Sequence, residues 1–216
     1  LPEVTISELT PRKRRFFLKH LARFLLLFES VKAKGSFLDN KRVIVTAAPH
    51  QSGKDEYLMI LMILALDIDV CYLSAKWTMR RIPIPFVKPK DIDNQGIPWP
   101  LGWLQEIVFR KFGAIPVDRK GNSGQYDSVV QELLKRDNFL LIITPEGRFD
   151  ATRFRSSFLY LAKELEAEVM PVQIDYEHDT LQFLDSLNLD GSEDEVIQRL
   201  RYCFDGVKGR KRRFKA

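Results

Sequence analysis

The chain has 216 residues and a mass of 25.2 kDa, which is enough for a domain with its own hydrophobic core. Apolar residues make up 45% of it and include 15 phenylalanines, which excludes a disordered or fibrous protein. The net charge of +5 is unevenly spread: residues 1–23 sum to +4, residues 206–216 to +6 and the remainder to −5. A net acidic body argues against a nucleic-acid-binding domain and favours contact between the basic ends and an anionic surface.

The N-terminal segment, residues 1–30, predicts an amphipathic helix with a basic beginning. Apolar residues recur at helical spacing from Phe17 to Phe28, after four consecutive cations at residues 12–15. Cations in the first turn oppose the helix dipole, and anionic lipid headgroups would offset that cost. Two interpretations stay open, and both can hold at once: the helix docks on a membrane surface, or it packs on the core with a solvated basic start.

From residue 42 onward, strand and helix patterns alternate. Apolar and β-branched runs predict strands at residues 42–47, 69–74, 114–117, 139–144 and 169–175. Helices are predicted at residues 54–66, 101–111, 123–136, 156–166 and 193–204. Residues 82–100 hold five of the 11 prolines and predict an irregular segment. The pattern indicates an α/β fold with a largely parallel central sheet flanked by helices, in a single domain over residues 1–216 that ends in a basic tail, residues 207–216.

Cysteine content and hydropathy bear on the compartment. Only Cys71 and Cys203 are present, so no disulfide framework is expected and a reducing compartment is indicated. The longest unbroken apolar run, residues 58–66, has nine residues, whereas a bilayer span needs about 20. We find no signal peptide, and because the sequence begins at Leu1 an upstream segment stays open.

His50 and Asp55 form the first candidate site. His50 follows a predicted strand and precedes a predicted helix, and loops after parallel strands are where open α/β sheets bind ligands. Asp55 falls in the first turn of that helix, from which its carboxylate can reach the imidazole and fix its tautomer. The alternative is equally weighted: Asp55 is an ordinary first-turn acid and His50 a loop residue.

Two further polar clusters follow predicted strands. Arg119 comes just after residues 114–117, and Glu146, Gly147 and Arg148 follow the most apolar strand. An arginine can hold a phosphate with two hydrogen bonds, and a glycine permits close approach of a ligand to the backbone. Each cluster alone could be an ordinary charged turn.

The sequence shows no candidate for a protein nucleophile or a metal site, and His20 and His178 have no obvious catalytic partner at working spacing. Gly121-Asn-Ser-Gly124 does not fit a nucleophile elbow, both cysteines fall inside predicted elements, and no Cys/His cluster has metal-ligand spacing. A histidine with a carboxylate but without a protein nucleophile suggests that a substrate hydroxyl attacks.

Four segments, in order, resemble the sequence blocks of the glycerolipid acyltransferases typified by 1-acylglycerol-3-phosphate acyltransferase. His50-Gln-Ser-x-x-Asp55 resembles the His-x4-Asp block, and Gly113-Ala-Ile-Pro-Val-Asp-Arg119 the second. Pro145-Glu-Gly-Arg148 resembles the third block and Met170-Pro-Val-Gln-Ile174 the fourth. The resemblance covers roughly residues 42–175. It departs at Pro49, where the family usually has Asn, and in the third block, which lacks a Thr and leaves Arg153 or Arg155 as substitutes for Arg148.

The resemblance implies the following activity and site. The protein would move an acyl chain from acyl-CoA or acyl carrier protein to the hydroxyl of a lysophospholipid, with 1-acylglycerol-3-phosphate as the expected acceptor, in phospholipid biosynthesis and without a metal or cofactor. His50 would be the general base and Asp55 its orienting partner. The acceptor site would contain Arg119, Glu146, Gly147 and Arg148, with Lys76 as a further substrate contact. The enzyme would be cytoplasmic and peripherally bound to the inner face of an anionic membrane.

Two other classes of protein are alternative interpretations of the sequence. The departures at Pro49 and in the third block allow a non-catalytic module of the same fold that only binds membranes. A nucleic-acid binder that uses Lys208 to Lys215 is disfavoured, because the body is net acidic and no nucleic-acid-binding motif is present.

Overall fold

The computed structural model describes residues 3–5, 8, 16–38, 40–82, 97–117, 124–147, 153–211 and 213–215. These residues form two compact units. Unit 1 comprises residues 1–69 and 137–216, and unit 2 comprises residues 70–136. Each unit is described by itself.

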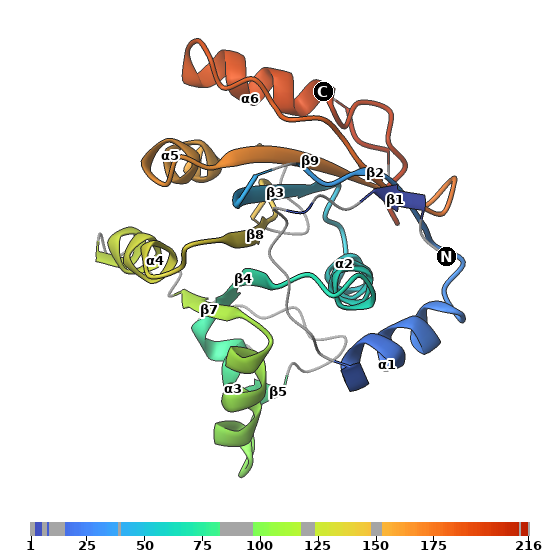
Figure 1. Ribbon diagram of the computed structural model, residues 1–216, viewed down its shortest axis with the longest axis vertical. Helices are drawn as coiled ribbons and strands as arrows, with labels where there is room; N and C mark the ends of the chain where they lie inside the picture. Colours follow the sequence, from blue (N-terminus) through green and yellow to red (C-terminus); the bar gives the residue numbers. More distant parts are fainter. Residues whose placement is uncertain are drawn as a thin grey trace. The chain divides into compact units, whose positions relative to one another are not determined.

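Unit 1 is built on a mostly parallel sheet in the order β1-β2-β10-β9-β3-β8 (Figure 1). Its bounds are β1 (Glu3–Thr5), β2 (Lys32–Ser36), β3 (Arg42–Ala48), β8 (Phe139–Ile143), β9 (Glu168–Asp175) and β10 (Thr180–Phe183). The central strand β3 pairs in parallel with β8 and with β9, so that Val45 lies between Ile142 and Met170. Among the described strands of this sheet, β9 and β10 form the only antiparallel pair. The side chains of β3 from Val43 onward are buried, which explains its continuously apolar sequence.

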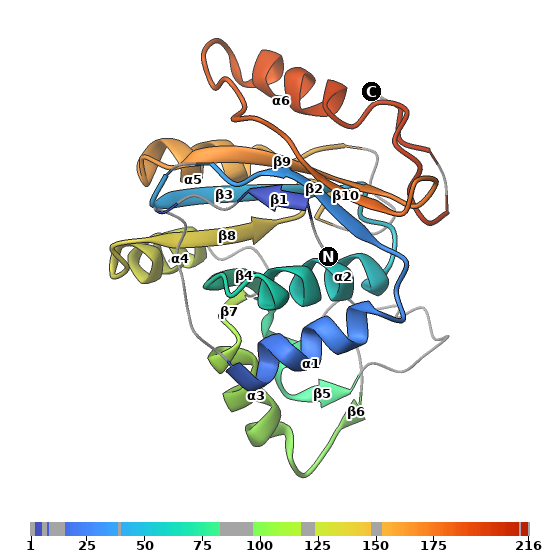
Figure 2. The same ribbon diagram turned by 45° about the vertical axis from the view of Figure 1, so that its right-hand side comes forward.

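The described residues of unit 1 form four helices: α1 (Phe16–Leu26), α2 (Gly53–Ala65), α5 (Ser157–Glu164) and α6 (Glu193–Tyr202). α2 and α6 lie on opposite sides of the sheet, as Figures 1 and 2 both show. Ser192 caps α6, because its side chain accepts a hydrogen bond from Glu195 N while Glu195 Oε2 accepts one from Ser192 N at 2.7 Å. This capping box explains why the helix begins at Glu193.

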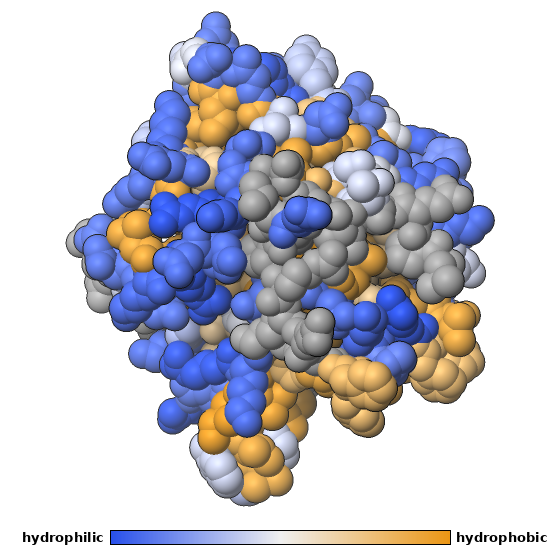
Figure 3. Space-filling model, viewed as in Figure 1, coloured by the Kyte–Doolittle hydropathy of each residue, from blue (hydrophilic) through white to orange (hydrophobic). Residues whose placement is uncertain are grey.

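Helix α1 packs on α2 with its phenylalanines exposed, and two of its cations form polar contacts at the end of α2. Lys19 pairs with Asp67, and Arg23 Nε donates to the Ala65 carbonyl at the end of α2. Of the residues of α1, Ala22 is buried, whereas the aromatic side chains on and just after the helix are exposed. Orange side chains gather over α1 in Figure 3. The predicted start of this helix falls outside the described residues.

The C-terminal segment folds back as a hairpin, which we define as residues 207–211 and 213–214. Phe214 N donates to the Val207 carbonyl at 2.8 Å, and Lys208 bridges Arg213 in antiparallel register. Phe214 is buried and packs on Phe154, with ring centroids 5.2 Å apart. The sequence predicts only a basic tail here, because a hairpin this short has no periodic sequence pattern.

Unit 2 contains the parallel pair β4 (Val70–Ala75) and β7 (Ala114–Val117), with α3 (Gly102–Lys111), α4 (Gly124–Leu134) and the short helix η1 (Lys76–Met79). Gly113 precedes β7 with φ +92°, and a Cβ there would lie 2.0 Å from the Val70 carbonyl oxygen, so only glycine fits. The Pro-rich segment contributes β5 (Arg81–Ile82) and β6 (Ile97–Pro98), which pair antiparallel; residues 83–96 lie outside the described residues.

The predicted α/β class and the largely parallel sheet are confirmed. Three strands of unit 1 were not predicted: β1, β2 and β10. β2 reads Lys-Ala-Lys-Gly-Ser and buries only Ala33, so it lacks the apolar alternation that predicts a strand. Within the described residues no helix is long and apolar enough to span a membrane.

Candidate active site

The His50 turn lies at the carboxyl end of β3, the central strand of unit 1. β3 ends at Ala48, a cis peptide bond joins Ala48 to Pro49, and α2 begins at Gly53. His50 is 4% exposed. The backbone N–H of His50 donates to Glu146 Oε2 at 2.6 Å, so the turn after β3 is tied to the turn after the neighbouring strand β8.

Asp55 organises this turn from the first turn of α2. Its Oδ2 accepts hydrogen bonds from the backbone N–H groups of Gln51, at 2.6 Å, and Ser52, at 2.8 Å. Asp55 is fully buried. Burial raises the pKa of Asp55. Hydrogen bonds from the imidazole of His50, the Tyr176 hydroxyl and these two N–H groups lower it by a larger amount, so the net shift of the pKa is downward. Asp55 is therefore a buried carboxylate and also a first-turn cap, which joins both interpretations of the sequence.

The imidazole of His50 lies between two carboxylates. Nδ1 is 3.6 Å from Asp55 Oδ2, and Nε2 is 3.4 Å from Glu56 Oε1. Both separations exceed an N–H···O hydrogen bond of about 3 Å, and such contacts often tighten when substrate binds. The Glu56 side chain is 60% exposed, so Nε2 points toward the accessible side of the turn. Glu56 is not among the residues predicted for the site, although its place next to Asp55 in the first turn of the helix is a signal for it.

The two carboxylates determine the charge of His50. Burial lowers the pKa of His50, but Asp55 and Glu56 raise it by more, and the resulting pKa is about 9. The imidazole therefore carries a proton at neutral pH. It gains the capacity to accept one as the pH approaches 9, or when a ligand separates Glu56 from Nε2.

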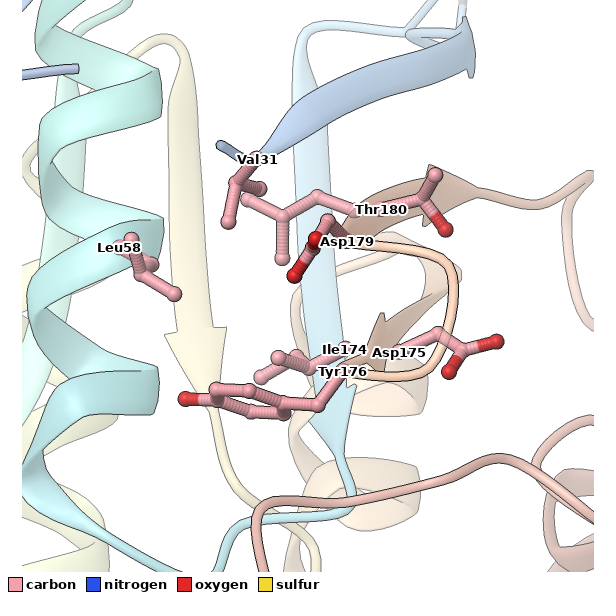
Figure 4. A pocket seen from close by; sticks show the side chains of 8 residues that line it. Val31, Leu58, Ile174, Asp175, Tyr176, Asp179 and Thr180 are labelled. Carbon is pink, nitrogen blue, oxygen red and sulfur yellow. The ribbon is translucent and has the colours of Figure 1, made fainter. Parts of the chain in front are cut away.

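Tyr176 is a further member of the site. It follows β9, and its hydroxyl donates to Asp55 Oδ1 at 2.6 Å. Figure 4 shows its ring reaching from the end of β9 toward α2, at the edge of a shallow hollow next to Leu58 and Ile174. Burial and then the Asp55 charge raise the pKa of Tyr176, which keeps the hydroxyl protonated as a donor. Tyr176 comes two residues after the fourth block, and no spacing rule connects it with Asp55.

Glu146 and Gly147 form the turn after β8. Glu146 is 4% exposed, and its carboxylate holds the His50 backbone. Gly147 has φ +65°, and a Cβ there would lie 3.1 Å from Arg155 Nε. The Arg155 guanidinium therefore lies against this turn, and Arg155 N donates to the Pro145 carbonyl at 2.8 Å.

The remaining predicted site residues are not brought together with His50 by the described structure. Arg119 and Arg148 lie outside the described residues. Lys76 is exposed at the start of η1, in unit 2. Their proposed roles therefore continue to depend on the sequence resemblance.

One group of side chains in the described part of the chain has ligand atoms close enough to hold a metal. Asp175, Glu177 and His178 lie in the turn between β9 and β10, with their ligand atoms within 4.8 Å of one another. His178 Nδ1 is 2.7 Å from Asp175 Oδ2, and Glu177 pairs with Arg213. These contacts already give the group a structural role in joining this turn to the C-terminal hairpin.

Comparison with known proteins supports acyl-transfer chemistry. A family model described as Acyltransferase matches residues 100–175, just over a third of the chain. The matched segment contains the second, third and fourth blocks and begins after His50 and Asp55. None of the curated proteins matches the chain. The match supports an acyltransferase without distinguishing its substrates.

Proposed function

We propose that this protein transfers a fatty acyl chain from acyl-CoA or acyl carrier protein to the hydroxyl of a lysophospholipid, with 1-acylglycerol-3-phosphate as the acceptor. The observation that carries the proposal is the position of His50 between Asp55 and Glu56 at the end of β3. The acyltransferase match to residues 100–175 supports the same chemistry from a separate part of the chain.

The chemistry needs one group that accepts and returns a proton. Neutral His50 takes the proton of the acceptor hydroxyl at Nε2 while the oxygen attacks the thioester carbonyl carbon. The tetrahedral intermediate collapses as its C–S bond breaks, and the thiolate takes the proton from His50. Asp55, next to Nδ1, holds the ring and stabilises the imidazolium. General-base assistance contributes about 10²–10⁴-fold to the rate.

Glu56 gives this site a particular pH dependence. It lies next to the nitrogen that would meet the acceptor, and it helps to keep that nitrogen protonated at neutral pH. An acceptor hydroxyl that reaches Nε2 has to separate it from Glu56. The separation removes one of the charges that raise the pKa of His50, so acceptor binding and activation of the base are coupled.

We place docking on an anionic membrane at residues 1–30. Phe16 and Phe17 are 79% and 74% exposed, and Phe24 and Phe28 are also exposed. Lys19 pairs with Asp67 and Arg23 donates to the Ala65 carbonyl, so polar contacts at the end of α2 hold the helix while its aromatic side chains are exposed. Four cations precede this helix in the sequence, and a basic segment beside exposed aromatic residues suits the interface of an anionic bilayer. An anionic membrane as the docking partner is consistent with a lipid acceptor.

A direct assay tests the proposed activity. Purified full-length protein is incubated with labelled palmitoyl-CoA and, separately, with lysophosphatidate, glycerol 3-phosphate or a neutral lysolipid. Thiol release and labelled lipid are measured together. We expect both with lysophosphatidate, and we expect His50→Ala to remove them while His178→Ala retains them. His178 is a matched control because it is an exposed histidine on the turn after β9.

Three results bear on the alternatives. Release of no thiol with any acceptor, together with vesicle binding, would replace the enzyme by a membrane-binding module. Normal turnover of His50→Ala would remove His50 as the base. For the acceptor site we expect Arg119→Ala to raise KM for phosphate-bearing acceptors and to leave KM for neutral lysolipids unchanged. An unchanged KM for lysophosphatidate would assign Arg119 a structural role.

Docking has its own test. Flotation with vesicles of phosphatidylglycerol and phosphatidylcholine should decline when Phe16, Phe17, Phe24 and Phe28 are replaced by serine, and it should also weaken with salt. The matched control replaces the exposed residues Tyr160 and Tyr202 by serine. Flotation that survives the four serine substitutions would place docking elsewhere.

A further inference from the structure

The C-terminal hairpin is fixed to the turn that carries His50. Lys211 N donates to the side-chain oxygen of Gln51, the residue after His50, at 2.7 Å. Gly209 lies directly on the same amide, since a Cβ there would be 2.6 Å from its carbon and nitrogen. Gln51 is 3% exposed. The C-terminal hairpin, which the sequence predicts only as a basic tail, thus packs against the turn that carries His50.

A second set of contacts holds the hairpin to Tyr176. Tyr176 N donates to the Lys208 carbonyl at 2.8 Å, while its hydroxyl holds Asp55. At the base of the hairpin Arg213 pairs with Glu177, and Phe214 is buried against Phe154 and Phe204. The hairpin is therefore anchored at its base by apolar packing and at its tip by hydrogen bonds, all within unit 1. Figure 2 shows this segment on the same side of unit 1 as the loop from β3 into α2.

The anchoring places two cations next to the turn. Arg210 and Lys211 are exposed, and among the described residues neither side chain forms an ion pair. The positive charge of Arg210 acts on Tyr176, where it partly offsets the burial and the Asp55 charge that raise the pKa of the hydroxyl. In the reactive state His50 is neutral, so the carboxylates of Asp55 and Glu56 beside it would repel an anionic acceptor unless cations offset their charge.

We propose that Arg210 and Lys211 form the subsite that holds the phosphate of the acyl acceptor, beside His50 and separate from Arg119. The inference rests on the proposed function and deepens it, because it names residues of the C-terminal hairpin that hold the phosphate of the acceptor. An arginine next to a lysine supplies several N–H donors to phosphate oxygens, and such charge-assisted hydrogen bonds are strong. The backbone that carries both cations is held at the His50 turn, because Lys211 N and Gly209 contact the Gln51 side chain.

Three phosphate sources can be separated by direct binding. Calorimetric titrations of the full chain use hexanoyl lysophosphatidate below its micellar concentration, hexanoylglycerol, which lacks the phosphate, and coenzyme A. Vesicles of phosphatidylglycerol and phosphatidylcholine form the fourth arm. The test variant is Arg210→Gln/Lys211→Gln. The control, Lys41→Gln/Lys163→Gln, removes the same charge from exposed residues, of which Lys41 precedes β3 at the end away from His50.

We expect the test variant to lose about tenfold or more in affinity for hexanoyl lysophosphatidate, the size of one charge-assisted hydrogen bond. Its affinities for hexanoylglycerol, coenzyme A and vesicles, and its free energy of unfolding, should match those of the control. An unchanged affinity for hexanoyl lysophosphatidate would overturn the subsite. An equal loss for hexanoylglycerol would also overturn it by showing a disturbed site, and a loss confined to coenzyme A or to vesicles would assign the cations to the donor or to the membrane.

The outcomes also separate this subsite from the proposed function. If the wild-type chain binds hexanoyl lysophosphatidate through these cations but transfers no acyl group, the catalytic proposal fails and the subsite stands. If it transfers acyl groups to lysophosphatidate while the test variant keeps the wild-type affinity and KM, the subsite fails and the enzyme stands.

Discussion

The hydroxyl of Tyr176 donates a hydrogen bond of 2.6 Å to Asp55, across 121 positions of the sequence. This contact connects the end of β9 to the first turn of α2 and supplies a donor to the carboxylate beside His50. Tyr176 reaches the imidazole only through Asp55, so it is a positioning residue.

Tyr176→Phe should lower kcat by about tenfold or more with KM unchanged, because the lost hydrogen bond to a charged group is equivalent to about 1.5–3 kcal/mol. The pKa of Asp55 should rise, since one of the groups that lower it is removed. Carboxyl NMR titration of the labelled protein measures that shift, which a loss of packing alone would not produce. Tyr202→Phe, on an exposed tyrosine, is the control. An unaltered Asp55 titration would contradict this role for Tyr176.

Glu56→Gln should shift the pH dependence of acyl transfer to lower pH. In the wild-type chain His50 must lose a proton to act as base, so kcat/KM should rise with pH and level off near the pKa of about 9. Removing the Glu56 charge lowers that pKa, so the variant should be more active than the wild type at pH 7. Glu164→Gln, in α5, changes a distant acid of unit 1 and should leave the profile in place. Superimposable profiles for wild type and Glu56→Gln would show that Glu56 does not set the charge of His50.

Protein stability should also depend on His50. Because its pKa is raised from 6.5 to about 9 by folding, the protonated imidazole stabilises the native state fully below pH 6.5. That contribution is lost as the pH rises to 9, and it amounts to at most about 3 kcal/mol. Urea unfolding of the wild type and of His50→Gln gives the free energy of unfolding of each at several pH values across this range. The difference between the two slopes of free energy against pH is the contribution of His50. An equal pH dependence of the free energy of unfolding in the two proteins would mean that the pKa of His50 is the same in the folded and unfolded chains.

Glu146→Ala should destabilise the His50 turn. The substitution leaves the buried N–H of His50 without its carboxylate partner, at a cost of about 1–3 kcal/mol. Glu146→Gln keeps an oxygen that can accept this hydrogen bond and should recover most of the stability. Activity should follow the same order, with kcat more affected than KM, because the backbone contact positions the base. Unfolding curves and single-turnover rates of both variants check this, and equal rates for the alanine and glutamine variants would argue against a positioning role.

The sequence by itself determined much of the unit 1 framework. The apolar runs of β3, β8 and β9 and the helix after His50 were predicted to within a few residues, because strands buried on both faces have a continuous local pattern. It also placed His50 at a strand end with Asp55 in the following helix turn. These features depend on residues that are close together in the chain, where the spacing in the sequence determines which way the side chains point.

Only the tertiary structure decided what surrounds that pair. Glu146 reaches the His50 backbone across 96 positions, and Lys211 reaches Gln51 across 160. Neither contact has a local pattern, because each arises where parallel strands end together or where the chain turns back after α6. The basic residues at the C-terminus illustrate the difference: their charge is evident from the sequence, but the place of their backbone at the turn that carries His50 follows from the burial of Phe214 and the close fit of Gly209 on Gln51.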